Sequence, residues 1–126
     1  MLTITLESLF VLVFAHWFFD FFCQTKWMAE NKSDSWKALF SHTVIYSGGM
    51  IVTMYLYSLI TNGLSIDNSI FFGLITFVIH TLTDAVSSRY SRKAYKVKKY
   101  RVFFNIIGFD QLTHIVQLTL SYVLLS

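Results

Sequence analysis

Four long apolar segments make up most of this 126-residue sequence, and they constrain its fold more than any other feature. They cover residues 3–24, 38–60, 69–90 and 102–125. A helix needs about 20 residues to cross the hydrocarbon core of a bilayer, and the chain has no proline that would break one. The pattern therefore predicts an all-α polytopic membrane protein, a single domain in which four transmembrane helices form an up-down bundle.

The composition excludes several other classes of protein. Hydrophobic residues make up 55% of the chain and charged residues 13%, whereas soluble domains average about 25% charged residues. A soluble domain of this size would expose more surface than so few charges can cover. We therefore exclude a disordered chain, a soluble nucleic-acid-binding protein and an ordinary soluble enzyme. The single cysteine, Cys23, excludes an internal disulfide framework and a cysteine-based zinc site.

The basic residues are unevenly distributed, and they predict the orientation of the bundle. All ten lysines and arginines fall in the connections at residues 25–37 and 89–101, and residues 61–68 contain none. The positive-inside rule places the two basic connections in the cytoplasm and both termini outside. Contact with anionic lipid head groups explains the second basic run better than nucleic-acid binding does. The residues predicted to make that contact are Arg89, Arg92 and Lys93.

Seven ionisable side chains lie inside the apolar segments, where such groups are costly and usually face the interior of a bundle. They are His16, Asp20, His42, His80, Asp84, Asp110 and His114. Three segments carry a histidine and an aspartate four residues apart, which places both side chains on one helix face. All seven lie roughly 6–16 Å from the predicted cytoplasmic helix ends, at about 1.5 Å per residue. Random placement would scatter them, so we predict that they converge on one point of the bundle.

Imidazole and carboxylate groups without thiolate suit a borderline or hard divalent ion, and zinc is the leading choice. All seven residues are predicted as ligands, because facing helices that supply histidine and acid residues build the metal sites of bundle cores. Seven ligands would serve two ions, or one ion with surrounding carboxylates that orient the histidines. Three more residues are expected to support the ligands by hydrogen bonds: Gln24, Tyr46 and Gln117. Gln111 directly follows Asp110, so its side chain is expected to point elsewhere.

The leading functional hypothesis is a membrane-embedded, metal-dependent hydrolase. A bound metal would lower the pKa of a water molecule and polarise the bond to be cleaved. A site in the cytoplasmic half of the membrane favours a lipid-linked or amphipathic substrate that enters from the inner leaflet. Asp84 and Asp110 are predicted as the catalytic carboxylates, one of them a general base, because both are expected to lie deeper than Asp20.

Two other functions are compatible with the same residues. The polar side chains would also serve as a proton or ion relay, but the outer half of the bundle offers few polar groups, such as Thr53 and Ser121, for a continuous path. Four helices are also few for alternating access unless the chain forms oligomers. In the third hypothesis the polar layer holds together a non-catalytic membrane factor that binds another membrane protein.

Four motifs follow one another along nearly the whole chain: AHWFFDFFCQTKWMAENK, LFSHTVIY, VIHTLTD and GFDQLTH. In their order and spacing they resemble a family of small bacterial and phage membrane proteins known as domain of unknown function 3307. The resemblance implies a membrane protein from a bacterium or its virus, and no established activity. Together with the four predicted spans, it predicts a multi-pass protein of the bacterial inner (cytoplasmic) membrane. A looser likeness, without matched motifs, is to inner-membrane metal-dependent hydrolases that also carry histidine and aspartate on apolar helices.

Overall fold

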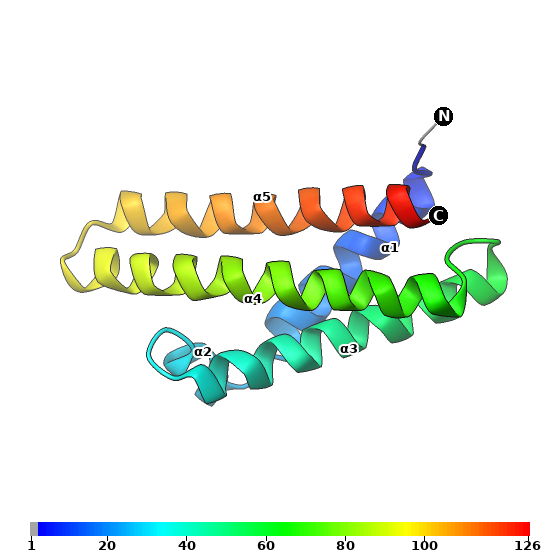
Figure 1. Cartoon of the computed structure of the whole chain (residues 1–126). Coiled ribbons are helices and arrows are strands. Elements are labelled where there is room, and N and C mark those ends of the chain that lie inside the picture. The colour runs from blue at the N-terminus through cyan, green and yellow to red at the C-terminus, as the bar shows by residue number, and fades with distance from the viewer. Residues whose placement is uncertain (1–2) are drawn as a thin grey trace.

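The computed structural model describes residues 3–126, and these residues form helices and connections without a β-strand (Figure 1). The helical elements are α1 (Leu6–Trp17), η1 (Phe18–Phe22), α2 (Lys26–Asn31), α3 (Trp36–Ile60), α4 (Ile66–Lys96) and α5 (Tyr100–Leu125). The prediction of an all-α fold is confirmed.

Most of the helices begin at a side chain that satisfies a free backbone N–H of the first turn. The capping residues are Thr5 for α1, Thr25 for α2, Ser35 for α3 and Ser65 for α4. Each hydroxyl oxygen accepts a hydrogen bond from the backbone N–H three residues later. These hydroxyl residues fix where each helix begins, and so they fix the register of the side chains within it.

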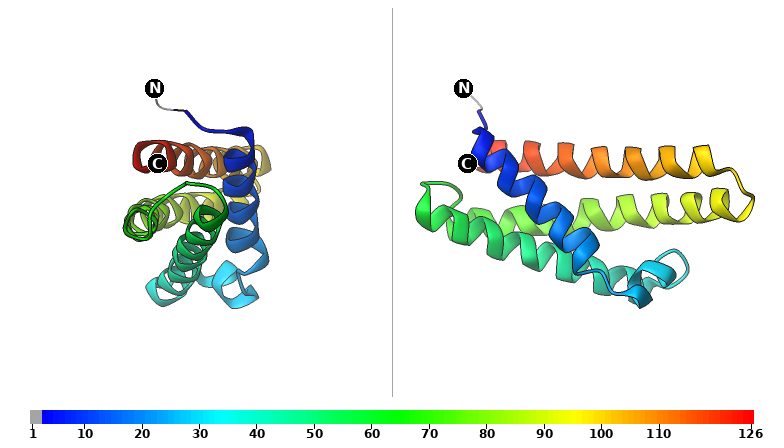
Figure 2. Two further views of the ribbon diagram at one scale, coloured as in Figure 1. Left: turned by 90° about the vertical axis from the view of Figure 1, so that its right-hand side faces the viewer. Right: turned by 180° about the vertical axis from the view of Figure 1, so that it is seen from behind.

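The four long helices alternate in direction, as Figures 1 and 2 show. α4 and α5 lie side by side and antiparallel, α3 packs against α4, and α1 crosses the others at an angle. The start of α1, the end of α5 and the α3–α4 connection lie at one end of the bundle, whereas α2 and the α4–α5 connection lie at the other end (Figure 1). The basic connections at residues 25–37 and 89–101 are therefore at the same end.

The first segment differs from the single helix predicted over residues 3–24. α1 ends at Trp17, and the chain continues through one π-helical turn, η1, closed by a 2.9 Å hydrogen bond from Cys23 N to Phe18 O. A π turn adds one residue to a helical turn and so changes the direction of the side chains beyond it. Asp20 lies within this turn and points toward α3, where its carboxylate meets His42.

A glycine of α3 lets this turn approach closely. Gly49 faces the ring of Phe19, and a Cβ atom at this position would overlap that ring. The neighbouring Gly48 faces open space, with no atom within 4 Å of a Cβ built there. Gly49 therefore sets the short distance between η1 and α3 that brings Asp20 to its partners.

Other helix bounds also differ from the predicted ones. The predicted loop at residues 25–37 contains α2, whose Met28 is buried against the bundle. α4 extends to Lys96 rather than ending near residue 90, because Ala94 is buried and the Tyr95 ring packs 5.2 Å from the ring of Phe103 on α5. Contact with α5 thus keeps the basic end of α4 helical.

α3 and α4 are each long and apolar enough to cross a membrane. The prediction of four spans goes beyond this finding, which covers two helices. Large apolar side chains face outward on every long helix, for example Phe10 at 69% exposure, Leu82 at 62% and Leu120 at 57%. Soluble proteins keep most such residues inside.

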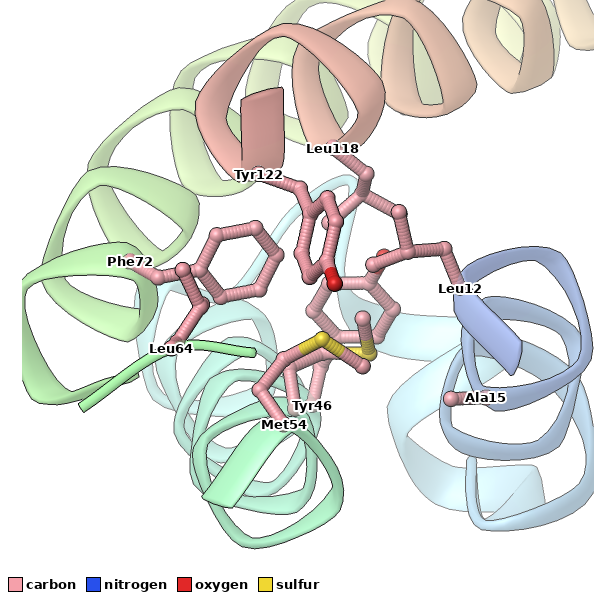
Figure 3. Packing of buried hydrophobic residues seen from close by; sticks show 9 residues of the cluster. Leu12, Ala15, Tyr46, Met54, Leu64, Phe72, Leu118 and Tyr122 are labelled. Carbon is pink, nitrogen blue, oxygen red and sulfur yellow. The ribbon is translucent and has the colours of Figure 1, made fainter. Parts of the chain in front are cut away.

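The apolar core lies in the part of the bundle nearest the termini (Figure 3). It contains Leu12, Ala15, Tyr46, Met50, Met54, Leu64, Phe72, Leu118 and Tyr122. Tyr46 and Tyr122 also bring hydroxyl groups into the interior, and Tyr122 Oη lies 3.2 Å from Ser8 Oγ. On each long helix the next inward-facing positions, toward the basic end, belong to a second and polar layer.

Candidate metal centre

The structure brings the seven ionisable residues predicted from the sequence into one buried cluster. None of their side chains is more than one tenth exposed. α1 supplies His16, η1 supplies Asp20, α3 supplies His42, α4 supplies His80 and Asp84, and α5 supplies Asp110 and His114. Residues distant in sequence thus meet because each helix turns one polar face inward at the same level.

Four of these residues, which we call the four-ligand group, direct one atom each toward a common point. The group consists of Asp20, His42, His80 and Asp84. His42 Nε2 lies 3.0 Å from Asp20 Oδ1 and 3.4 Å from Asp84 Oδ2. His80 Nε2 lies 3.5 and 3.7 Å from the same two oxygens. The two Nε2 atoms are 3.2 Å apart.

These separations match the edges of a coordination tetrahedron. Zinc–ligand distances of about 2.0–2.2 Å place tetrahedral ligand atoms about 3.3–3.6 Å apart. Five of the six separations among the four atoms run from 3.0 to 3.7 Å. All four atoms lie within 4.8 Å of one another. The group could therefore hold a divalent ion with little movement of its side chains.

A second group shares Asp84. Asp84 Oδ1 lies 3.2 Å from His114 Nε2, and Asp110 Oδ2 lies 3.3 Å from the same nitrogen. Ser87 Oγ donates a 2.5 Å hydrogen bond to Asp110 Oδ1. The two groups also touch through His80 Nδ1 and His114 Nδ1, which are 3.2 Å apart.

His16, predicted as a ligand, has both ring nitrogens in other contacts. His16 Nδ1 lies 2.7 Å from Tyr46 Oη and His16 Nε2 lies 2.9 Å from Gln111 Oε1. Because an amide oxygen only accepts, Nε2 carries the proton, and Nδ1 accepts from the tyrosine hydroxyl. His16 therefore lies beside the ligand groups and forms hydrogen bonds with Tyr46 and Gln111, two residues next to those groups.

The expectation that Gln111 points away from the cluster is wrong. Its Nε2 donates to Asp20 Oδ2 at 3.2 Å and to Asp110 Oδ2 at 3.0 Å. Adjacent positions on a helix differ by about 100° in direction, but the glutamine side chain is long enough to return to its neighbour's face. Gln111 thereby links α5 to η1 and to His16.

Lys32 is a site residue that the sequence analysis missed. Its Nζ donates to Asp84 Oδ2 at 2.8 Å, and the side chain is 20% exposed. Burial lowers the pKa of Lys32, but the negative charges of Asp84 and Asp20 outweigh burial, so that the pKa is raised and the ammonium persists. Lys32 follows α2, in a connection without helical periodicity. Its position in the sequence therefore contributed to the predicted orientation in the membrane but did not predict a contact with the cluster.

The predicted supporting residues occupy different places. Tyr46 contacts His16. Gln24 borders a cavity beside the cluster, and its Oε1 is buried without a partner among the described residues. Gln117 donates to Thr76 and Ser121, both at 3.1 Å, and these bonds lead away from the seven ionisable residues.

The three predicted head-group residues also differ from one another. The guanidinium of Arg89 lies 4.7 Å from the centre of the Trp36 ring. Arg92 pairs with Asp34 and donates to Ser33 Oγ at 2.7 Å, which ties α4 to the segment after α2. Lys93 is exposed.

A cavity of about 550 Å³ adjoins the cluster between η1, α2, α4 and α5. Asp20, Asp110, Gln111 and Lys32 form its inner wall. Serines 87, 88 and 91 and Arg92 line it along α4, and Phe21, Phe103 and Ile107 add an apolar surface. A volume in this range is typical of small-molecule sites.

The family model described as "protein of unknown function (DUF3307)" matches residues 8–126, nearly the whole chain. No curated protein and no solved structure shows a significant match.

Proposed function

This chain belongs to the DUF3307 family, whose function is unknown, and we propose that it is a membrane-embedded metalloprotein that acts as a metal-dependent hydrolase. The observation that carries the proposal is the four-ligand group, where two imidazole nitrogens and two carboxylate oxygens face one point at near-tetrahedral separations. Two Nε2 atoms at 3.2 Å repel unless a proton or a cation lies between them. A divalent ion satisfies all four atoms at once.

The hydrogen-bond pattern favours one ion per chain. His80 and His114 meet through their Nδ1 atoms, so one must donate and the other accept. If His80 Nε2 binds an ion, its proton is on Nδ1 and is donated to His114. The remaining proton of His114 is then on Nε2, directed at Asp84 and Asp110. His114 in this arrangement orients His80 and the carboxylates instead of binding a second ion.

With a water molecule as a fifth ligand beside the four protein atoms, a bound ion would acidify that water and act as a Lewis acid for hydrolysis. The residues around the ion would bind it and orient the water molecule. Asp84 lies between the two groups and accepts from Lys32, which suits a ligand. Asp110 borders the cavity and is held by Ser87 and Gln111, which suits the carboxylate that orients a water molecule toward the substrate.

The membrane location is supported by the apolar exterior and by α3 and α4, and we extend it to four spans with both termini outside. The basic end of the bundle then faces the cytoplasm of a bacterium. The cavity lies at this end, and its mixture of charged and apolar walls suits a lipid-linked or amphipathic substrate.

The test is the metal content of the detergent-purified protein after exposure to Zn²⁺, Mn²⁺ or Co²⁺ and removal of the excess. We expect about one ion per chain in the parent, as for a site with four protein ligands. Asp20→Asn and His80→Ala should lose it, while Asp67→Asn, an exposed aspartate in the first turn of α4, should retain it. A parent that binds no ion would end the proposal.

The hydrolase part is tested separately with the metal-loaded protein and a panel of lipid-linked phosphoesters and amides. Asp110→Asn should retain the ion and lose turnover. Retained turnover in this variant would remove Asp110 from the mechanism.

One observation favours transport of a proton or ion as a second function. The outer half of the bundle is more polar inside than the sequence indicated, because Gln117, Thr76 and Ser121 form a buried hydrogen-bonded chain next to the apolar core. Proteoliposomes with an internal pH dye test this function. Proton flux that Gln117→Leu abolishes would favour a relay over a hydrolase.

A further inference from the structure

We propose that the cavity beside the metal centre binds a phosphate group carried by an amphiphile, and that binding requires the metal ion. The inference rests on the proposed metal site and narrows its substrate class from esters and amides in general to phosphoesters. It is carried by the donors that line the cavity, by two buried polar atoms that lack partners, and by the charge of the cluster behind it.

The wall formed by α4 offers two donors that are free for a ligand, the Ser88 hydroxyl and the Arg92 guanidinium. The other two serines on this wall already donate, Ser87 to Asp110 and Ser91 to the Ser88 carbonyl oxygen. Ser87, Ser88 and Ser91 line the cavity within little more than one helical turn, and Arg92 follows. Arg92 uses Nη1 for its contacts with Ser33, Asp34 and the Glu30 carbonyl oxygen. A guanidinium has five N–H donors, so its other edge can bind a phosphate oxygen.

Two buried polar atoms on the cavity wall lack a partner among the described residues. Ser88 is 9% exposed and its Oγ makes no hydrogen bond, and Gln24 Oε1 is likewise without one. Buried polar groups are nearly always paired in folded proteins, so such atoms point to a ligand or water in the cavity. Ser88 can donate to a phosphate oxygen, whereas Gln24 Oε1 is an acceptor and pairs with a donor on the ligand, such as a protonated phosphate oxygen or a bound water molecule.

The charge of the cluster explains why the ion is needed. Without an ion, and with the neighbouring His42 and His114 neutral, the three carboxylates of Asp20, Asp84 and Asp110 outnumber the ammonium of Lys32 and repel an anion. A divalent ion together with Lys32 balances the three carboxylates. The repulsion then disappears, and the two free N–H groups of Lys32 become attractive partners for a phosphate.

The apolar wall of the cavity explains why the proposed ligand is an amphiphile. Phe21, Phe103 and Ile107 border the cavity and offer apolar contact to an acyl or prenyl chain, whereas inorganic phosphate would leave this surface uncovered. A phosphate attached to an apolar chain uses both walls.

The experiment measures ³¹P relaxation on the detergent-solubilised protein loaded with Co²⁺, a paramagnetic ion that suits zinc-type ligands. Three probes are compared: inorganic phosphate, dihexanoyl phosphatidic acid and, by calorimetry, uncharged dihexanoylglycerol. We expect cobalt-dependent ³¹P relaxation for both phosphates. Calorimetry should show tighter binding of phosphatidic acid than of inorganic phosphate, and no binding of either to metal-free protein. Phosphate binding equal to that of phosphatidic acid would keep the phosphate site and identify a soluble phosphate as its source. Binding of dihexanoylglycerol as tight as that of phosphatidic acid, or no phosphate binding to cobalt-loaded protein, would overturn the inference.

Variants separate recognition from folding. Ser88→Ala should weaken phosphatidic acid binding about fivefold and Arg92→Gln about tenfold or more, with the cobalt content unchanged. Asp34→Asn removes the salt-bridge partner of Arg92 but keeps the cation, so it should bind phosphate at least as tightly as the parent. Equal weakening in Asp34→Asn and Arg92→Gln would show that Arg92 acts only in structure. A parent without cobalt would refute the metal site itself, and this result differs from one in which cobalt binds and phosphate does not.

Discussion

Gly48 and Gly49 are adjacent in the middle of α3, and the structure gives opposite outcomes for an alanine at each. A Cβ atom at Gly48 meets no atom within 4 Å, whereas at Gly49 it would overlap the ring of Phe19. Gly48→Ala should gain the helix propensity of alanine, about 0.5–1 kcal/mol. Gly49→Ala gains the same propensity but overpacks the contact between η1 and α3, which costs about 1–3 kcal/mol.

The two variants should therefore differ in stability by about 1–3 kcal/mol in favour of Gly48→Ala. Thermal unfolding in detergent, followed by circular dichroism, measures this difference as a few degrees in Tm for each kcal/mol. Gly49→Ala should also bind metal more weakly, because a displaced η1 carries Asp20 away from His42. Phe19→Leu in the Gly49→Ala background should restore both properties by removing the overlap. Equal Tm values for the two alanine variants would refute the packing argument.

Three further predictions concern the cluster. Tyr46→Phe leaves His16 Nδ1 buried without its 2.7 Å partner, which should cost about 1–3 kcal/mol in thermal unfolding; an unchanged Tm would mean that water replaces the hydroxyl. EDTA should lower the Tm of the parent and leave that of Asp20→Asn unchanged, because an ion bound only by the folded chain stabilises it; an equal response would place the chelated ion elsewhere. Since the pKa of Lys32 is raised above 10.5 in the folded chain, its contribution to stability is present below that pH and is lost as the pH rises through the raised pKa. Lys32→Met should lack this alkaline loss in urea titrations at increasing pH, and a decline identical to that of the parent would assign it to other groups.

The convergence of the seven ionisable residues could be predicted because helical periodicity and depth are both encoded locally. A spacing of four puts His80 and Asp84 on one face, and counting residues from the helix ends gives a common level. Both arguments hold for straight helices whose ends are marked by charges. Periodicity and depth therefore predict the position of the cluster, although the predicted bounds of α1 and α4 differ from the observed ones by several residues.

The features that were not predicted depend on contacts between segments. The π turn at Phe18–Phe22 is fixed by the approach of Phe19 to Gly49, and a helical wheel drawn for an α-helix cannot contain it. Lys32 reaches Asp84 across 52 positions of sequence, from a connection without periodicity. The prediction that Gln111 points away from the cluster used only the direction of its Cα–Cβ bond. The flexible glutamine side chain nevertheless reaches two neighbouring carboxylates.

The length of α4 has a consequence for the proposed location of the protein in a membrane. Its 31 residues correspond to about 46 Å, while the hydrocarbon layer is about 30 Å thick. A helix that enters this layer at its first turn leaves it near Val86, just before the serines and Arg92 that line the cavity. The cavity would then lie at the level of the polar head groups, and lipids with longer acyl chains would draw its wall into hydrocarbon. Bilayer thickness would thereby control access to the cavity, and shorter-chain lipids should leave the cavity more accessible from the aqueous side.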